Sequence, residues 1–277
     1  MKILILALSL VSANALAWGP TGHRVVGEIA HKFLDVETLS KVHRILKGES
    51  LAKVSTWPDE IKSEPQTYSH TFNWHYTTWA DEVHDHSAER EDATGGFLLK
   101  EISENLAVLK DPKATDEKKA FSLKFIVHLI GDLHMPLHVG GGNDQGGNYC
   151  KVTFHGKATN LHQLWDEGMI DFTNLSFTEM SRFVSEGRKI ADITSWKMGD
   201  VLTWAQESKT LRNTLYPADV APVANLVQTR KYCQKDVLPE DMPKLGYEYS
   251  YKFMPVVEQR LYQAGLRLAV LLNQNLQ

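Results

Sequence analysis

The sequence predicts an all-α fold, a single mainly helical domain with a few short strands. Apolar residues recur at helical spacing through most of the chain after residue 17, whereas the alternating patterns typical of strands are few. We find no low-complexity linker, no internal repeat and no apolar run of membrane-spanning length. With 43% apolar residues in the chain, residues 18–277 are numerous enough to bury one large core, so we expect them to form one domain.

The predicted helices follow one another along the chain, each with apolar residues on one face. They span residues 25–34, 36–46, 97–109, 118–133, 160–169, 177–190, 200–215 and 256–273. Gly48 and Pro112 lie just beyond the ends of the second and third helices, as is typical of helix termini, and Pro255 would occupy the first turn of the last helix. Residues 151–154 are the clearest strand, and we expect the aromatic, histidine-rich stretch 66–91 to be an ordered loop region.

Residues 1–17 have the pattern of a cleavable signal peptide. Lys2 provides a charged start, residues 3–10 are apolar, and Ala15 and Ala17 form a small-x-small cleavage site. The apolar run is too short to cross a bilayer. We therefore expect a secreted or periplasmic protein without a membrane anchor, whose mature chain begins at Trp18.

The two cysteines, Cys150 and Cys233, allow at most one internal disulfide. Disulfides persist in exported proteins, and closing a loop of this length would stabilise the fold by roughly 4 kcal/mol if chain entropy is the main contribution. We therefore expect the bridge to form, and two separate buried thiols are the alternative.

The overall charge excludes one class of function. A formal net charge of −4 argues against a protein that holds duplex DNA through a wide basic surface. A small site that is positive only locally is still compatible with this charge. The function therefore has to be sought in local clusters of residues.

Histidines and aspartates recur at spacings suited to binding a metal. His128 and Asp132 are four residues apart on a predicted helix, as are His162 and Asp166, so each pair projects from one helix face. The further candidates are Asp59, His75 and His138. Neutral imidazole and carboxylate are usual zinc ligands, and a charged Asp132 within an apolar segment is costly unless it is paired or bound to metal. One such pair is more typical of an ordinary hydrogen bond, but two pairs favour a metal site.

Signal cleavage would add a further ligand, the new N-terminus at Trp18. A neutral terminal amine and the carbonyl oxygen of the same residue are able to close a five-membered chelate ring on a metal. His23 follows closely enough in the sequence to join them. Removal of the signal peptide is therefore expected to build part of the active site.

Ordered motifs run through the mature chain. They are Trp18-Gly19-x-x-Gly22-His23, Trp57-Pro58-Asp59-x-Ile61-Lys62, Trp74-His75-Tyr76, His128-Leu129-Ile130-Gly131-Asp132-x-x-x-Pro136-Leu137-His138, Gly141-Gly142-Asn143-Asp144-x-Gly146-Gly147-Asn148, Asn160-Leu161-His162-x-Leu164-Trp165-Asp166, Trp204-Ala205-x-Glu207-Ser208, and Pro255-Val256-Val257-Glu258 with Ala264-Gly265-x-Arg267-Leu268-Ala269. With these motifs the whole mature chain resembles the zinc-dependent, single-strand-specific nucleases and 3′-nucleotidases of the nuclease S-one/P-one type.

The resemblance implies the helical fold of the zinc-dependent phospholipase C and single-strand nuclease type, and a cofactor of three Zn²⁺ ions. It assigns one buried zinc to Asp59, His75 and His128. It assigns a second to the amine and carbonyl of Trp18 and to His23, with Asp132 bridging the two. It assigns a third, more exposed zinc to His138, His162 and Asp166.

The resemblance further implies a secreted endonuclease that cleaves single-stranded DNA and RNA to 5′-phosphate products and also acts on 3′-nucleotides. The catalytic hypothesis is in-line attack by a hydroxide that bridges the two buried zincs at Asp132, while the third zinc stabilises the leaving 3′ oxygen. Lys62 matches a family lysine near the scissile phosphate, and a solvated surface lysine is the alternative. Three Zn²⁺ ions against three carboxylates leave a charge of about +3, which would capture phosphate in an acidic protein.

The glycine-rich loop at residues 140–148 is expected to bind a nucleobase, because family members bind a base beside such a loop. The residues assigned to this role are Asn143, Asp144, Gly147 and Asn148. A tight turn without a binding role is the alternative. The aromatic candidates for stacking on the base are Tyr149, Phe154 and Trp79.

The chain departs from the family at several positions. Many members carry an acidic residue three positions after the histidine matched by His75, where it helps to position the attacking water; this chain has Thr78. Asp81 is near in sequence, but nothing in the sequence indicates that it substitutes. The family's multiple disulfides are reduced to at most one. We expect structural or surface roles for His31, His43, His70, His84, His86, His134 and His155, and His84 and His86 would also suit adventitious metal.

Two other functions are alternatives. A zinc-dependent phospholipase C would share the fold, the terminal tryptophan and the ligand set but cleave a lipid headgroup, and the 140–148 loop and the segment 204–208 favour a nuclease. A zinc-storage or structural zinc protein would close its coordination with protein ligands, whereas the third zinc's ligand set leaves a position open. No stable protein partner is implied, and we expect a monomer.

Overall fold

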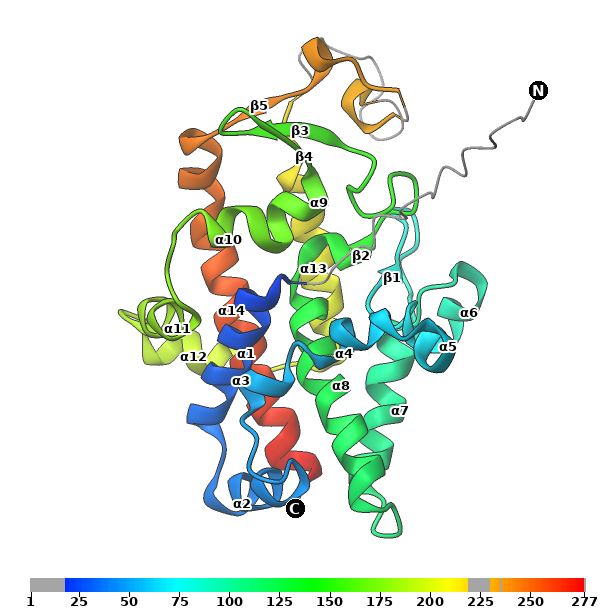
Figure 1. Ribbon diagram of the computed structural model, residues 1–277, viewed down its shortest axis with the longest axis vertical. Coiled ribbons are helices and arrows are strands. Elements are labelled where there is room, and N and C mark those ends of the chain that lie inside the picture. Colours follow the sequence, from blue (N-terminus) through cyan, green and yellow to red (C-terminus); the bar gives the residue numbers. More distant parts are fainter. Residues whose placement is uncertain (1–17, 219–229, 235, 277) are drawn as a thin grey trace, which may run out of the picture.

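The structure, a computed structural model, describes residues 18–218, 230–234 and 236–276. Helices make up most of it and the strands are short, which confirms the mainly helical fold (Figure 1). The predicted signal peptide at residues 1–17 lies outside the described residues.

The elements follow in chain order. The α-helices are α1 (Pro20–Phe33), α2 (Val36–Ile45), α3 (Leu51–Val54), α4 (Trp57–Glu60), α5 (Pro65–Tyr68), α6 (Glu91–Thr94), α7 (Leu98–Lys110), α8 (Asp116–His134), α9 (Leu161–Gln163), α10 (Met169–Asp171), α11 (Phe177–Ser185), α12 (Ile190–Trp196), α13 (Val201–Leu215) and α14 (Tyr247–Asn275). The 3₁₀ turns are η1 (Ile61–Ser63), η2 (Ser69–Thr71), η3 (Ala88–Arg90), η4 (Pro136–His138), η6 (Lys231–Cys233) and η7 (Pro239–Asp241), and η5 (Leu164–Gly168) is a π-helical turn. The strands are β1 (Thr77–Thr78), β2 (Val139–Gly140), β3 (Lys151–Phe154), β4 (Lys157–Asn160) and β5 (Lys244–Leu245).

Helices α1, α8 and α14 pack on one another at the centre of the core, and α7 covers another side of α8 (Figure 1). Glycines make the close packing of α1 possible. A Cβ atom at Gly265 of α14 would lie 2.6 Å from the Cβ of Ile29, and one at Gly27 would lie 2.7 Å from the backbone nitrogen of Ala52 in α3. Residues 125–134 of α8 are all buried, so the second half of this helix runs through the interior of the protein.

Several predicted boundaries are wrong. The helix predicted at 177–190 ends at Ser185, and Gly187 shortly after it adopts the left-handed conformation typical of helix ends, with φ of 69°. The last helix contains Pro255 in its interior. Pro255 is exposed, so water is able to bond the carbonyl that its missing N–H leaves without a partner. Residues 66–91 contain the short elements α5, η2, η3 and β1 in addition to loops.

The strands form two small sheets. Strand β3, predicted at residues 151–154, pairs antiparallel with β4 and parallel with β5. Strands β1 and β2 form a separate two-residue parallel ladder in which Thr77 lies opposite Val139. A disulfide joins Cys150, just before β3, to Cys233 in η6, and the expected bridge is therefore confirmed.

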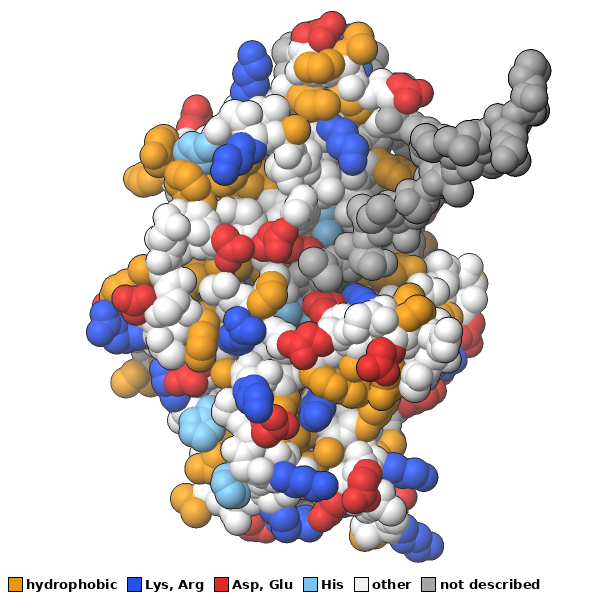
Figure 2. Space-filling model, viewed as in Figure 1, with side chains coloured by type: hydrophobic (Ala, Val, Ile, Leu, Met, Phe, Trp, Pro, Cys, Tyr) orange, Lys and Arg blue, Asp and Glu red, His pale blue; other side chains and the backbone are white. Residues whose placement is uncertain are grey.

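The surface agrees with the low net charge. On the face shown in Figure 2, Lys and Arg side chains alternate with Asp and Glu and do not gather into a broad basic area. Across the part of the chain that the structure describes, none of the helices combines the length and the apolar character needed to cross a bilayer.

A cluster of buried charges connects α13 and α14 to the end of α8. Arg260 and Arg267 are each 1% exposed, and both donate hydrogen bonds to the Glu207 carboxylate at 2.6–2.7 Å. Arg260 also donates to the His134 carbonyl at 3.1 Å, and Arg267 to the His134 ring at 3.0 Å. Burial by itself would raise the pKa of Glu207, but the two arginines outweigh it and lower this pKa below its ordinary value of 4.5.

Replacing Glu207 by Gln should destabilise the fold by about 1–2 kcal/mol near neutral pH, because it leaves two buried guanidinium groups without a counter-charge while the carboxylate itself is 35% exposed and partly screened by water. Since the folded-state pKa of Glu207 is lowered, its contribution is fully present above the unfolded-state pKa and is lost as the pH falls through the folded-state pKa. Denaturant unfolding near neutral pH and in acid measures both effects. The gap between wild type and Glu207→Gln should shrink in acid, and an equal gap at both pH values would contradict this assignment. The control is Glu186→Gln, whose side chain is 64% exposed.

Candidate metal centre

Histidines and aspartates from distant parts of the chain meet in three groups, in each of which the ligand atoms lie within 4.8 Å of one another. The groups are His23, His128 and Asp132; Asp59, His75 and His128; and His138, His162 and Asp166. Only Asp59 among them is partly rather than fully buried. We refer to the first two, which share His128, as the inner groups and to the third as the outer group. The structure thus brings together every side chain proposed as a metal ligand.

Asp132 lies at the centre of the inner groups. Because an α-helix has about 3.6 residues per turn, Asp132 and His128 share one face of α8, and His128 Nε2 lies 3.3 Å from Asp132 Oδ2. His23 Nε2 lies 3.3 Å from Oδ1, and His75 Nδ1 lies 3.2 Å from Oδ2. One fully buried carboxylate therefore faces ligands from α1, from α8 and from the segment before β1, a geometry suited to bridging two cations.

The outer group is built from η4 and from the helical segment after β4. His162 Nε2 lies 3.0 Å from Asp166 Oδ2, and His138 Nε2 lies 3.6 Å from Asp166 Oδ1. The segment predicted as one helix over residues 160–169 is divided into α9, the π-helical turn η5 and α10. Asp166 lies within the π turn, a distortion that is frequent at functional sites.

The backbone fixes the orientation of three of the imidazole rings. The Nδ1 atoms of His128, His138 and His162 face the carbonyl oxygens of Ser55, His75 and Gly146 at 2.7, 2.6 and 2.7 Å. An Nδ1–H that donates to a carbonyl leaves the lone pair of the ring on Nε2, and metal-binding histidines usually have this arrangement. In all three residues the Nε2 atom then points toward a carboxylate of its group.

Several polar atoms that face one another in these groups are buried and lack a hydrogen-bond partner among the described residues. They include His23 Nε2, Asp132 Oδ1, His138 Nε2 and Asp166 Oδ1. Such atoms are costly in a protein interior unless something satisfies them. Cations would do so, and imidazole nitrogen with carboxylate oxygen is a donor set typical of zinc sites. The residues therefore fit a zinc cluster.

The protonation of the site depends on its burial and on its carboxylates. Burial, together with the Lys62 ammonium, lowers the pKa of His75 to about 4. Burial also opposes charge on His138, but the nearby carboxylates of Asp166 and Asp132 outweigh it and raise the pKa of His138 to about 9. Since metals bind neutral imidazole, a cation in the outer group would displace the proton of His138.

Trp18 lies beside both kinds of group. Its side chain is fully buried, and the N–H of Gly19 donates to the Asp166 carbonyl at 2.8 Å. A Cβ atom at Gly131 would lie 2.9 Å from Nδ1 of His23 and 3.6 Å from Cδ1 of Trp18. The missing side chain at Gly131 therefore leaves room on α8 for these two rings.

A cleft of about 470 Å³ opens onto the centre. His75, from an inner group, and His138 and His162, from the outer group, form part of its lining. Lys62 also lines it, with a side chain only 8% exposed and Nζ 2.7 Å from Asp59 Oδ1. Lys62 is therefore not a solvated surface lysine.

Only part of the predicted base-binding loop lines this cleft. Asn148 is in the lining, whereas Asn143, Asp144 and Gly147 are not. Asp144 instead accepts a hydrogen bond from the Tyr216 hydroxyl at 2.6 Å. The other loop residues in the lining are Gly140, Gly142, Gln145 and Gly146.

None of the aromatic residues predicted to stack on a base lines the cleft. Trp79 and Phe154 are buried in the core and Tyr149 is exposed outside the lining. Phe72 and Tyr76 are the aromatic residues of the cleft wall. The sequence offered one indication of this role for Tyr76, because it directly follows His75, a proposed metal ligand.

Thr78, at the position where the family resemblance predicts an acidic residue, lies in the lining of the cleft. Asp81 does not line the cleft. Its carboxylate accepts hydrogen bonds from Arg212 and Asn213 instead. Asp81 therefore does not take the place of the missing acid.

The remaining histidines stand outside the three groups. His86 bonds the Thr77 hydroxyl at 3.0 Å, His134 bonds Arg267, and His155 stacks on Phe172 with ring centres 4.0 Å apart. The exposed ones are His31, His43, His70 and His84. Within the described residues His84 and His86 belong to no group that could hold a metal.

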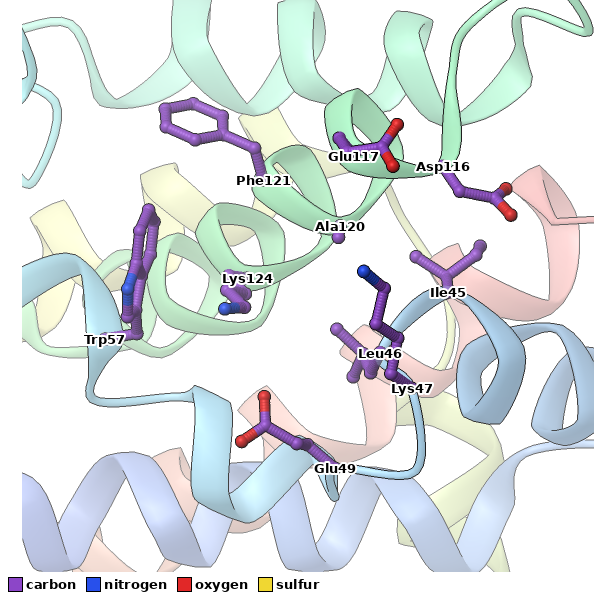
Figure 3. A pocket seen from close by; sticks show the side chains of 10 residues that line it. All are labelled: Ile45, Leu46, Lys47, Glu49, Trp57, Asp116, Glu117, Ala120, Phe121 and Lys124. Carbon is purple, nitrogen blue, oxygen red and sulfur yellow. The ribbon is translucent and has the colours of Figure 1, made fainter.

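A second depression, of about 500 Å³, lies between the end of α2 and the first half of α8 (Figure 3). Lys47, Lys124 and Glu117 line it beside apolar side chains, so charges of both signs face it. Trp57 forms one wall, with Lys124 Nζ 4.7 Å from its ring centre. No residue of the three groups belongs to this lining, so the depression is separate from the metal centre.

Replacing Gly146 by Ala should weaken metal binding by the outer group. Gly146 has φ of 60°, a Cβ atom there would lie 2.4 Å from the Leu137 carbonyl oxygen, and its own carbonyl orients His162. We expect the affinity for one metal ion to fall by about 10-fold or more, measured by equilibrium dialysis and metal analysis. Gly156→Ala is the matched control, because Gly156 also has positive φ, 78°, but has nothing within 4 Å. Equal metal affinities of the two variants would contradict this role.

Comparison with known proteins agrees with this geometry. Residues 18–277 match the S1/P1 Nuclease family. Endonuclease 4 of Arabidopsis thaliana is 32% identical over 287 aligned positions, which cover 97% of this chain and 92% of that protein. Nuclease S1 of Aspergillus oryzae is 28% identical over 271 positions, covering 92% and 91%. Nuclease P1 of Penicillium citrinum is 28% identical over 189 positions, covering 65% and 64%.

The family match therefore includes all residues of the inner and outer groups and the cleft above them. The chain is similar to proteins that are named nucleases, over nearly the full length of both chains. It also has a site that is able to hold metal ions. The chain belongs to the S1/P1 nuclease family and is a nuclease, a hydrolase of the phosphodiester bonds of nucleic acids.

Proposed function

We propose that the protein is a zinc-dependent endonuclease that cleaves single-stranded DNA and RNA to 5′-phosphate products, and that it also hydrolyses 3′-nucleotides. The observation that carries this proposal is the convergence of three His and Asp groups beneath one cleft. The predicted leader at residues 1–17 supports export, to the periplasm or outside the cell, and we expect the protein to act as a monomer.

The inner groups would hold two zinc ions. Asp59, His75 and His128 would bind one of them, and Asp132 would bridge to the other. The ligands of that second ion would include His23, and those of the third ion would be His138, His162 and Asp166. By the family resemblance, the amine and carbonyl of Trp18 would complete the second site. Zinc bound there would lower the pKa of a coordinated water and neutralise charge on a phosphodiester.

Lys62 supports capture of a phosphate at the cleft floor. Its ammonium lies 2.7 Å from Asp59 and faces the cleft beside His75. A hydrogen bond from this ammonium to a non-bridging phosphate oxygen would hold the diester against the inner groups and counter the charge that develops as the bond breaks. The positive potential would be local, which suits a chain with a net charge of −4.

The cleft walls support a preference for single strands. Phe72 and Tyr76 offer aromatic surface, and Asn148 and Gln145 offer amide donors and acceptors. A base is able to use such a wall only when it is splayed out of its stack, which is costly in a duplex. Base preference would then follow from the amides of the glycine-rich loop.

A substrate panel on metal-loaded protein that begins at Trp18 tests the proposal. Single-stranded DNA and RNA should be cleaved at least about tenfold faster than the matched duplex, since stacking contributes roughly 1–3 kcal/mol per base. Mass spectrometry of the fragments should find 5′-phosphate ends. Chelation should abolish cleavage and added zinc should restore it. Hydrolysis of phosphatidylcholine without release of nucleotides would contradict the proposed endonuclease activity and support a phospholipase C instead.

The N-terminus gives a second test. A variant that keeps Ala17 in front of Trp18 should lose about one bound zinc and most of its activity, because an amide nitrogen cannot replace the free amine as a neutral donor. Metal content by elemental analysis and cleavage of single-stranded DNA are the two readouts. The matched control begins at Trp18 but carries a C-terminal extension of the same length. Full zinc content and full activity in the N-terminally extended protein would rule out the terminal chelate.

A further inference from the structure

Arg212 of α13 is a fully buried cation outside the three metal groups. It is 1% exposed, and its guanidinium donates hydrogen bonds to four acceptors. Three of them lie far away in the sequence, and the fourth is the side chain of the next residue. Nη1 donates to the carbonyl oxygens of Trp79, at 2.9 Å, and of Val139. Nη2 donates to the carboxylate of Asp81, and Nε lies 3.4 Å from Asn213 Oδ1.

Two of these acceptors belong to the segments that follow metal ligands, since Val139 is in β2 and Trp79 directly follows β1. Strand β1 begins two residues after His75, and β2 begins directly after His138. Their ladder is only two residues long, with Thr77 opposite Val139, and the Trp79 N–H donates to the Gly140 carbonyl at 2.8 Å. So short a ladder is not stable alone. Arg212 stabilises the ladder because it donates to one carbonyl oxygen on each side of it.

The ladder joins an inner group to the outer group. His138 Nδ1 lies 2.6 Å from the carbonyl oxygen of His75. This contact lies just before the residues at which the two strands begin to pair. Nδ1 of His138 is also 4.0 Å from Asp132 Oδ1. The distance between the inner and outer groups therefore depends on how firmly the segment after His75 is held against the segment after His138.

The chemistry at this point requires an arginine. A buried charge is tolerated only when its donors are satisfied and a counter-charge is near, and here the Asp81 carboxylate supplies that charge. A planar guanidinium presents several donors in a fixed fork, whereas a lysine ammonium cannot reach three acceptors in one plane. This also explains why Asp81, the acid closest in sequence to Thr78, is turned away from the cleft.

We propose that Arg212 is a positioning residue of the metal centre, which holds His138 at a set distance from the inner groups by binding both strands of the short ladder. The proposal rests on the proposed zinc-dependent function. It makes metal binding by the outer group, rather than folding, the property that Arg212 controls.

Lys209 provides a matched control one turn earlier on α13. It is 7% exposed, its Nζ donates to the Val83 carbonyl at 2.6 Å and to the Asp81 carbonyl at 3.3 Å, and it lies 4.8 Å from the Trp79 ring centre. Lys209 thus holds the segment after β1, as Arg212 does. In the described part of the chain it has no hydrogen bond to β2. A difference between Lys209→Met and Arg212→Met therefore isolates the link between the two strands.

The test is equilibrium dialysis of the metal-free proteins, beginning at Trp18, against buffered free zinc. In Arg212→Met the weakest zinc site should lose about 10–100-fold in affinity, and Lys209→Met should keep wild-type affinity. Arg212→Lys should lie between them, and it carries the test if Arg212→Met does not fold. At limiting zinc, kcat of Arg212→Met on single-stranded DNA should fall with little change in KM, and excess zinc should restore it.

Equal zinc affinities of Arg212→Met or Arg212→Lys and of Lys209→Met would overturn the proposal. So would a kcat that stays low at saturating zinc in a folded Arg212→Met protein, because the loss would then not lie in metal binding. The failure of the proposed function has a different signature. Wild-type protein would then bind zinc and cleave no nucleic acid, and the dialysis comparison would still decide the role of Arg212.

Discussion

The buried carboxylate of Asp132 is the interaction on which the rest of the structure depends. An ionised carboxylate in a protein core is costly unless partners surround it. Here His23, His75 and His128 surround it at 3.2–3.3 Å. These residues come from α1, from the segment before β1 and from α8 itself, so satisfying one charge brings distant parts of the chain together. The constraint that organises the fold is therefore also the one that assembles the metal centre.

The remainder of the protein keeps that carboxylate in place without contributing ligands. Gly131 leaves room for the His23 ring against α8, and Gly265 lets α1 approach α14. Arg260, bound to Glu207, holds the carbonyl of His134 at the end of α8. The glycines let the helices approach closely, and the arginine holds a backbone carbonyl through a charge-assisted hydrogen bond. A mobile α8 would separate Asp132 from its partners.

The electrostatics of the site agree with membership of the S1/P1 nuclease family. The chain is acidic overall, and the face in Figure 2 has no broad basic area. A nucleic acid would therefore have to be bound by a local charge at the cleft floor, from Lys62 and bound cations, and by the cleft wall. Such a site would favour strands that are able to enter a cleft of about 470 Å³.

The sequence by itself determined the helical class and the pairs of potential ligands four residues apart, because helical periodicity and i, i+4 spacing are local properties. Its two cysteines allowed one disulfide, and the structure shows that Cys150 and Cys233 form it. It also determined the family, through motifs that keep their order. The tertiary structure alone decided which residues line the cleft: Tyr76 is in the lining, whereas Trp79, which we had expected there, is buried. It alone decided that Arg212 joins the strands after two ligands. Burial and contacts between distant residues depend on how the helices pack, and local spacing carries no record of that packing.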